Sequence, residues 1–129
     1  MILALDYGTR YIGIAITDPD ENLALRHSVI DQKQHDVLSL LKKIIDQEKV
    51  GTILIGVPIS LSGNPSQQTH LTRDFITKLQ AGFPTLTIKE VDETLTSWSA
   101  DEQIRQEGGK KEDAHMEAAR LILQTHLTK

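Results

Sequence analysis

The chain has 129 residues, of which 39% are hydrophobic and 25% are charged, and its net charge is −4. This ordinary globular composition predicts one domain over residues 1–129, and the acidic balance argues mildly against a nucleic-acid partner. Cysteine is absent, which excludes a disulfide framework and a thiolate zinc site. We find no signal-peptide pattern and no apolar run of membrane-spanning length, so we expect a cytoplasmic protein without a membrane partner.

The first part of the chain is predicted to form three antiparallel strands. Apolar runs cover residues 1–6 and 11–17, and a turn around Gly8 separates them. After a second turn at residues 18–22, residues 23–30 form a third, more polar strand. A helix is expected next, because five apolar residues recur at helical spacing. These residues are Val37, Leu38, Leu41, Ile44 and Ile45.

The second part alternates strands and helices. The continuous apolar run at 52–57 is typical of a strand covered on both faces, and residues 86–93 form the fifth strand. Ser66 is the expected N-cap of the helix between them. The apolar residues of that helix expected to point inward are Leu71, Phe75, Ile76 and Leu79. Two further helices are expected at residues 97–107 and 113–127.

The order of these elements predicts an α/β fold. Three strands joined as a meander, followed by two helical crossovers to parallel strands, give a five-stranded mixed sheet with helices on both faces. In a sheet of this kind the ligand site lies beyond the carboxyl ends of the parallel strands.

Two acidic residues, Asp6 and Glu93, end apolar strands at this predicted edge. An unpaired carboxylate at a buried strand end is costly, so it needs a purpose other than packing. Carboxylates delivered to one edge of a sheet can share Mg²⁺ or Mn²⁺, and two such ions can promote attack on a phosphodiester. Asp92 points to the opposite face of its strand from Glu93 and is expected to be local support. Taken alone, Asp6 with Gly8 is also compatible with a simple hairpin turn.

The last predicted helix offers a third residue for this site. On a helical wheel His115 starts a buried stripe that continues through Ala118, Ala119, Ile122 and His126. The opposite face is expected to be exposed to solvent and carries Asp113, Glu117, Arg120 and Gln124. His115 is therefore either a metal ligand beside the two carboxylates or a core residue whose hydrogen bonds are satisfied.

Several residues near the predicted site could contact phosphates. Gly8 would let a phosphate approach the backbone closely, and Thr9 and Arg10 follow it in the same turn. Lys110 and Lys111 precede the last helix and are the basic alternative. Exposed basic residues of this kind are usually ordinary solvated charges, so the pattern leaves both interpretations open.

Together these motifs resemble the YqgF family, small ribonuclease H-like proteins related to RuvC-type Holliday junction resolvases. The family is regarded as nucleases that mature the 5′ end of pre-16S ribosomal RNA. The matching motifs occur in the same order through the whole chain. The resemblance depends on their order and spacing, because no single motif is decisive. The matching segments are residues 5–10 (LDYGTR), 12–15 (IGIA), 55–58 (IGVP), 91–97 (VDETLTS) and 118–124 (AARLILQ).

The resemblance implies a first strand at the centre of the sheet and a two-metal carboxylate site. Asp6 matches the family's first-strand aspartate, and Glu93 matches its glutamate. The family's helix aspartate falls on His115, and Asp113 could replace it by a local shift of register. The family's usual arginine after the Asp-Glu pair is Thr94 here, which removes one possible phosphate contact.

We therefore expect a metal-dependent nuclease acting on structured nucleic acid, either pre-16S ribosomal RNA at its 5′ end or branched DNA. Asp6 would bridge the metals, Glu93 would hold one, and His115 or Asp113 would hold or orient the other. The protein would be a monomer or a homodimer. One alternative is a non-catalytic nucleic-acid or ribosome-assembly module. The other is a phosphate-binding domain of the actin and sugar-kinase type, which shares the Asp-x-Gly-Thr loop.

Overall fold

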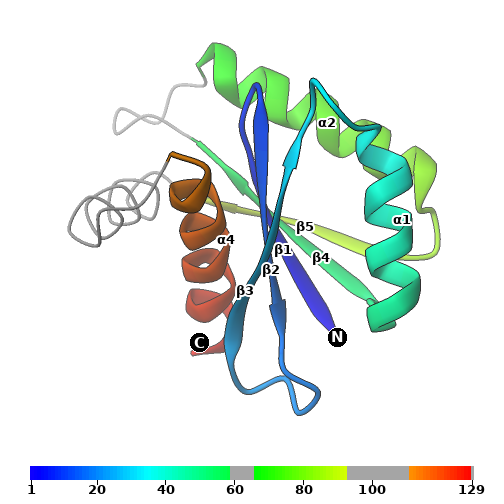
Figure 1. Ribbon diagram of the computed structural model, residues 1–129, viewed down its shortest axis with the longest axis vertical. Coiled ribbons are helices and arrows are strands. Elements are labelled where there is room, and N and C mark those ends of the chain that lie inside the picture. The colour runs from blue at the N-terminus through cyan, green and yellow to red at the C-terminus, as the bar shows by residue number, and fades with distance from the viewer. Residues whose placement is uncertain (59–65, 93–110, 129) are drawn as a thin grey trace.

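The computed structural model describes residues 1–58, 66–92 and 111–128 (Figure 1). The described strands and helices are β1 (Ile2–Tyr7), β2 (Tyr11–Thr17), β3 (Ala24–Asp31), α1 (Val37–Glu48), β4 (Thr52–Val57), α2 (Gln67–Gly82), β5 (Thr87–Asp92) and α4 (Lys111–Leu127). The helix predicted at 97–107 lies outside the described residues. Among the helices within them, none is both long enough and apolar enough to cross a membrane.

The five strands form one mixed sheet in the order β3-β2-β1-β4-β5. The meander β1–β2–β3 is antiparallel, and β1–β4 and β4–β5 are parallel, as the sequence predicts. The hairpin between β1 and β2 is closed by the amide of Gly8, which donates to the carbonyl of Tyr11 at 2.9 Å. The first strand is therefore central, with β2 on one side and β4 on the other.

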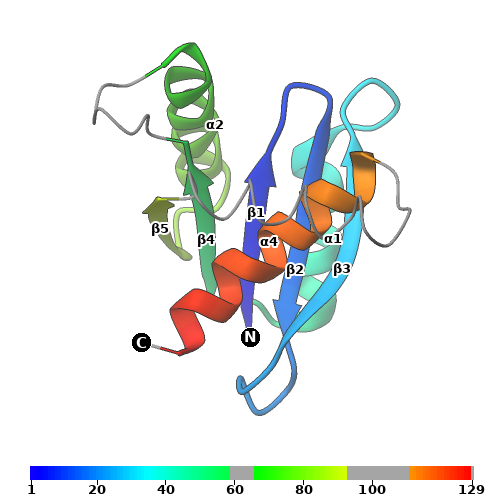
Figure 2. The same ribbon diagram turned by 90° about the vertical axis from the view of Figure 1, so that its left-hand side faces the viewer.

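Helices cover both faces of the sheet, which confirms that part of the prediction. α1 and α2 lie on one face and α4 crosses the other, over β1, β2 and β3 (Figures 1 and 2). Strand alternation divides β1 between the two layers, because successive side chains point to opposite faces. Leu3 and Leu5 join the larger apolar core under α1 and α2, whereas Ala4 packs with Ala119 and Ile122 of α4.

Capping residues set where the two helices of the first face begin. Asp36 accepts a hydrogen bond from the amide of Ser39 at 3.1 Å and starts α1. Ser66 and Thr69 form a reciprocal capping box that starts α2, so the predicted N-cap is confirmed. One inward-facing assignment is wrong: Leu71 of α2 is 38% exposed, because the helix buries Thr69 and Thr72 against the sheet instead.

Candidate active site

Asp6 lies at the carboxyl end of the central strand. Its neighbours across the sheet are Gly13 of β2 and Gly56 of β4. Its side chain is 8% exposed and points to the face that α4 covers, since it shares that face with Ala4 two residues earlier. A nearly buried carboxylate therefore stands where the topology of an α/β sheet places ligand sites.

His115, in the second turn of α4, contacts this carboxylate directly. Its Nδ1 atom lies 2.6 Å from Oδ2 of Asp6, a short hydrogen bond between residues 109 positions apart. The imidazole is 32% exposed, so the pair lies at the protein surface rather than in the sealed core. The structure thus brings together two of the residues that the sequence singles out.

Two glycines make room for this contact. A Cβ atom on Gly8 would lie 2.7 Å from Cε1 and 3.1 Å from Nε2 of His115, so the ring occupies the space beside that glycine. A Cβ on Gly13 would lie 2.1 Å from the backbone carbon and oxygen of His115. The sequence motifs predict phosphate approach at Gly8 and no separate role for Gly13; in the structure both border the histidine.

The turn that carries Gly8, Thr9 and Arg10 is supported by a glutamine outside the recognised motifs. Gln32 donates its side-chain amide to the carbonyl of Gly8 at 2.7 Å and its backbone N–H to the carbonyl of Arg10 at 2.8 Å. A lone glutamine in a loop carries no sequence signal for such a role, because its partners lie more than twenty residues away.

The basic and hydroxyl side chains of this turn are exposed. Thr9 and Arg10 both lie at the surface, and the guanidinium of Arg10 lies over the ring of Tyr11 at 4.9 Å. Arg10 also pairs with Asp31 at 3.3 Å. A backbone hydrogen bond from Lys33, followed by the contact with Arg10, lowers the pKa of Asp31 below its ordinary value, so this carboxylate is ionised at neutral pH.

The prediction that Glu117 faces solvent is wrong. Its side chain is fully buried, and it accepts hydrogen bonds from Nε of Arg26 at 2.5 Å and from Nε of Arg120 at 2.7 Å. Burial would raise the pKa of Glu117, but the hydrogen bonds and charges of Arg120 and Arg26 outweigh that effect and lower the pKa. The physical reason is that α4 lies across β3, so its polar face meets Arg26 instead of water.

The other candidate residues fall into two groups. Asp113 lies within α4, which begins at Lys111, so it is not in a preceding loop that could swing inward. It is two residues from His115, about 200° around the helix. Glu93 and Lys110 lie outside the described residues, and for Lys111 only its place at the start of α4 is described.

The described donors fit part of a metal site. The carboxylate of Asp6 is a hard oxygen ligand that suits Mg²⁺ or Mn²⁺, and the adjacent imidazole suits Mn²⁺ better than Mg²⁺. Within residues 1–58, 66–92 and 111–128, no three His, Cys, Asp or Glu side chains converge on one point. A complete site would therefore need a donor from outside these ranges, such as Glu93.

Comparison with known proteins matches the whole chain to one family. The family model described as "RuvX: Holliday junction resolvase" matches residues 1–129. A protein of Maridesulfovibrio salexigens named "Putative pre-16S rRNA nuclease" is 36% identical over 99% of this chain and 98% of its own length. A Flavobacterium psychrophilum protein of the same name is also 36% identical, over 99% of this chain and 96% of its own.

A solved structure supports the fold. The chain resembles T. thermophilus RuvC, solved in complex with a Holliday junction substrate, with a TM-score of 0.63 over 97% of this chain and 91% of that one. The sequence identity is 10%, so the likeness concerns the fold alone. It confirms the predicted ribonuclease H-like architecture.

Proposed function

The chain belongs to the RuvX (YqgF) family, and on this premise we propose that it is a metal-dependent nuclease that hydrolyses phosphodiester bonds in structured nucleic acid. The observation that supports this most directly is the 2.6 Å contact between Asp6 and His115 at the carboxyl end of β1. A buried carboxylate held in one orientation at a sheet edge is a suitable ligand for a hard cation, and the bound cation can in turn bind a phosphate. The names of its relatives make the 5′ end of pre-16S ribosomal RNA the first substrate to test, with branched DNA as the second.

Asp6 is the proposed principal metal ligand, and Glu93 would supply the second carboxylate. When bound, Mg²⁺ or Mn²⁺ would activate water and neutralise charge on the phosphate. A carboxylate that holds a metal carries no proton, so in the metal-bound site Nδ1 of His115 would be the donor and Oδ2 of Asp6 the acceptor of their 2.6 Å hydrogen bond. His115 therefore holds the carboxylate in a fixed orientation, and of the two candidates for the third position it is the one beside Asp6.

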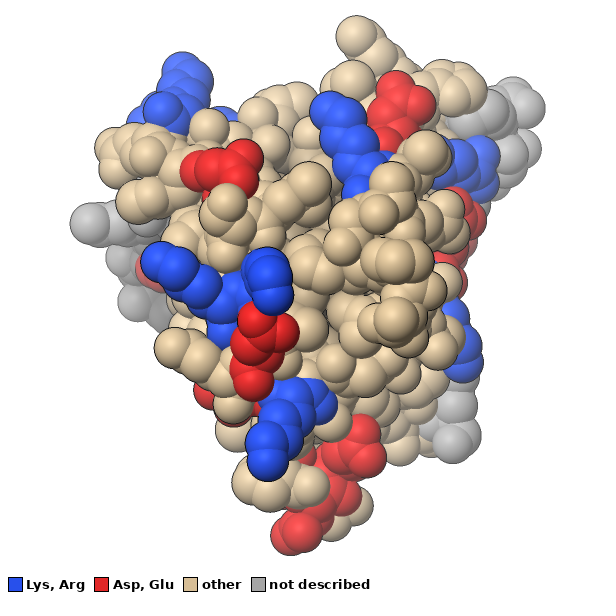
Figure 3. Space-filling model, turned by 90° about the vertical axis from the view of Figure 1, so that its right-hand side faces the viewer, with Lys and Arg blue, Asp and Glu red and all other residues tan. Residues whose placement is uncertain are grey.

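The nucleic acid would approach the edge that carries the β1–β2 turn. The face covered by α1 and α2 offers no continuous basic surface in the region visible, because Lys and Arg alternate there with Asp and Glu (Figure 3). The β1–β2 turn carries the exposed Arg10. The next residue, Tyr11, has its ring centroid 6.4 Å from that of His115, so Arg10 is near the candidate active site. We also propose that the protein acts as one domain in the cytoplasm.

Asp6→Asn tests the proposal, with Asp74→Asn as the matched control because Asp74 is exposed on α2. Cleavage of a labelled pre-16S fragment and of a four-way DNA junction would be measured with Mg²⁺ and with Mn²⁺, and Mn²⁺ affinity by calorimetry. We expect Asp6→Asn to abolish cleavage and weaken metal binding. Its thermal stability without metal should change little, since asparagine can still accept from His115.

Three outcomes would each contradict a part of this proposal. An Asp6→Asn variant that is less stable but still cleaves would show that the carboxylate serves the fold. Metal binding by the natural protein without cleavage of any structured substrate would support a non-catalytic nucleic-acid module instead. Loss of cleavage in Asp74→Asn as well would point to an effect of net charge rather than of the site.

A further inference from the structure

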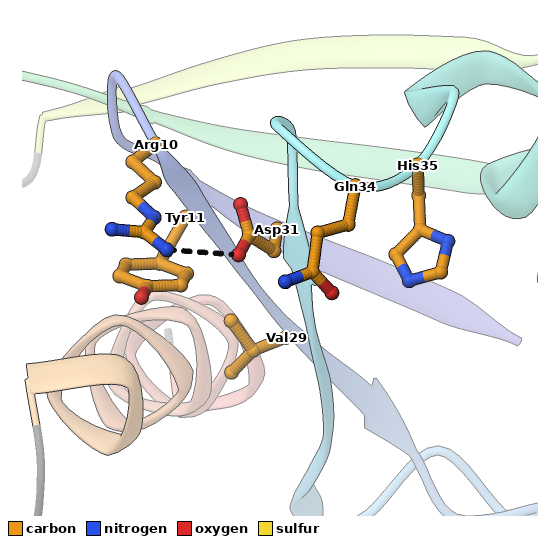
Figure 4. A pocket seen from close by; sticks show the side chains of 6 residues that line it. All are labelled: Arg10, Tyr11, Val29, Asp31, Gln34 and His35. Carbon is orange, nitrogen blue, oxygen red and sulfur yellow. Dashed lines mark hydrogen bonds and ion pairs between the residues drawn. The ribbon is translucent and has the colours of Figure 1, made fainter.

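A hollow of about 390 Å³ lies beside the candidate active site, between the β1–β2 turn and the loop after β3. Figure 4 shows Arg10 and Tyr11 on one side of it and Gln34 and His35 on the other, with Asp31 and Val29 between them. Pockets that bind small organic groups have volumes of about 300–1,000 Å³, so this one suits a single nucleotide unit. Its lining is mainly polar, which favours a hydrogen-bonding ligand over an apolar one.

The two walls of the hollow are tied to each other. Gln32 donates to the carbonyls of both Gly8 and Arg10, which joins the loop after β3 to the turn after β1. The backbone N–H groups of Gln34 and His35 donate to the backbone carbonyl of Asp31, each at 3.1 Å. This network sets the places of Gln34 and His35 relative to Arg10, so the hollow is formed before any ligand arrives.

Arg10 is placed to receive a phosphate. Its guanidinium is stacked over Tyr11 and paired with Asp31 at 3.3 Å, with nearly half of its side chain exposed. A guanidinium has five N–H donors, so the exposed part of Arg10 can bind a phosphate while its pair with Asp31, which is 16% exposed, persists. Stacked guanidinium planes are also surfaces on which unpaired bases stack.

Two neighbouring rings, those of Tyr11 and His115, connect the hollow to Asp6. Tyr11 lines the hollow and its ring centroid lies 6.4 Å from that of His115, which in turn contacts Asp6. A nucleotide in the hollow would thus be close along its strand to a phosphodiester at Asp6.

We infer that this hollow binds one unpaired nucleotide next to the phosphodiester at Asp6. Arg10 would bind its phosphate, and the Gln34 amide and the His35 ring would hydrogen-bond to the base edge or sugar. The inference rests on the proposed nuclease function, because it names the part of the substrate strand that this site reads. It makes an unpaired segment, rather than a continuous duplex, the substrate form.

The test removes the far wall of the hollow and leaves Asp6 untouched. The double variant Gln34→Ala/His35→Ala is compared with Gln80→Ala/His70→Ala, in which the same residue types are removed from exposed positions on α2. Binding of fluorescein-labelled single-stranded RNA, single-stranded DNA and a duplex of the same sequence is measured by anisotropy with EDTA, so that no cleavage occurs. Thermal unfolding of each variant checks that it is folded.

We expect the double variant to bind both single strands roughly tenfold more weakly, as the loss of two hydrogen bonds predicts, and the control to bind as the natural protein does. Duplex binding should change little. A greater loss for RNA than for DNA would mean that the ribose hydroxyl is also read. Equal single-strand affinities in the two double variants would overturn the inference.

Cleavage of the pre-16S fragment with Mg²⁺ is measured separately on the same proteins. If the natural protein cleaves and the hollow variant binds normally, the nuclease function stands and the nucleotide site is rejected. If the hollow variant loses binding but the natural protein cleaves nothing, the nucleotide site stands and the nuclease function is rejected. No single-strand binding by the natural protein would reject the nucleotide site.

Discussion

Gly13 sets the position of His115 in the candidate site. It pairs with Asp6 across the β1–β2 ladder, and a Cβ atom on it would lie 2.1 Å from the backbone carbon and oxygen of His115. The glycine that stands beside the carboxylate is thus also the surface on which the helix rests. Its missing side chain lets α4 come close enough for the imidazole to reach Asp6.

Gly13→Ala should therefore destabilise the protein and disrupt the site. Helix backbone cannot move aside as a flexible side chain can, so we expect the free energy of unfolding to fall by about 1–3 kcal/mol or more. Gly51→Ala is the control, because nothing lies within 4 Å of a Cβ built there. Urea unfolding of both variants measures the difference, and equal stabilities would show that α4 is free to shift.

His115→Ala should weaken Mn²⁺ binding and cleavage more than Asp113→Ala does. The reason is geometric: His115 contacts Asp6, and Asp113 lies about 200° around the same helix. Calorimetry with Mn²⁺ and a cleavage assay would measure both effects. The reverse order, with activity retained in His115→Ala and lost in Asp113→Ala, would make Asp113 the third residue of the site.

Glu117→Gln should lower the free energy of unfolding by about 1.5–3 kcal/mol, because a buried carboxylate that accepts from two arginines loses its charge. Glu90→Gln is the control. Glu90 pairs with Arg73 at 3.4 Å, but both side chains are nearly half exposed, so the same change should cost less than about 1 kcal/mol. Chemical denaturation at neutral pH compares them, and similar losses would mean that burial does not strengthen the Glu117 contacts.

The stabilisation by Glu117 should depend on pH with a definite sign. Its pKa in the folded protein lies below the ordinary value of 4.5, so the unfolded chain binds the proton more readily. The contribution is complete above the ordinary value and is lost as the pH falls through the lowered pKa. The stability difference between the natural protein and Glu117→Gln should then be constant from about pH 7 to about pH 5 and shrink towards about pH 3. A difference that grows on acidification would contradict the sign.

The strands and the face to which each side chain points follow from the sequence because they depend on local pattern, whereas the central place of the first strand was implied only by the family resemblance. The apolar run at 52–57 predicts a strand covered on both faces. Within residues 1–6, strand alternation places Leu3 and Leu5 on one face and Asp6 on the other, whatever packs against them. The same reasoning on a helix separates His115 from Asp113. Side chains repeat every two residues along a strand and every 3.6 residues along a helix, so both patterns can be found from the sequence alone.

What only the tertiary structure decided is which residues meet across the chain. The buried state of Glu117 depends on Arg26, 91 positions earlier in the chain. A helical wheel identifies the polar face of α4, but it cannot show whether that face meets water or a charged side chain. The roles of Gly8 and Gly13 likewise depend on α4, because His115 occupies the space that a side chain on either residue would need. The sequence does not show which residue fills that space. The sequence alone determined the layers and the place of the carboxylate, and the packing of α4 determined its partner.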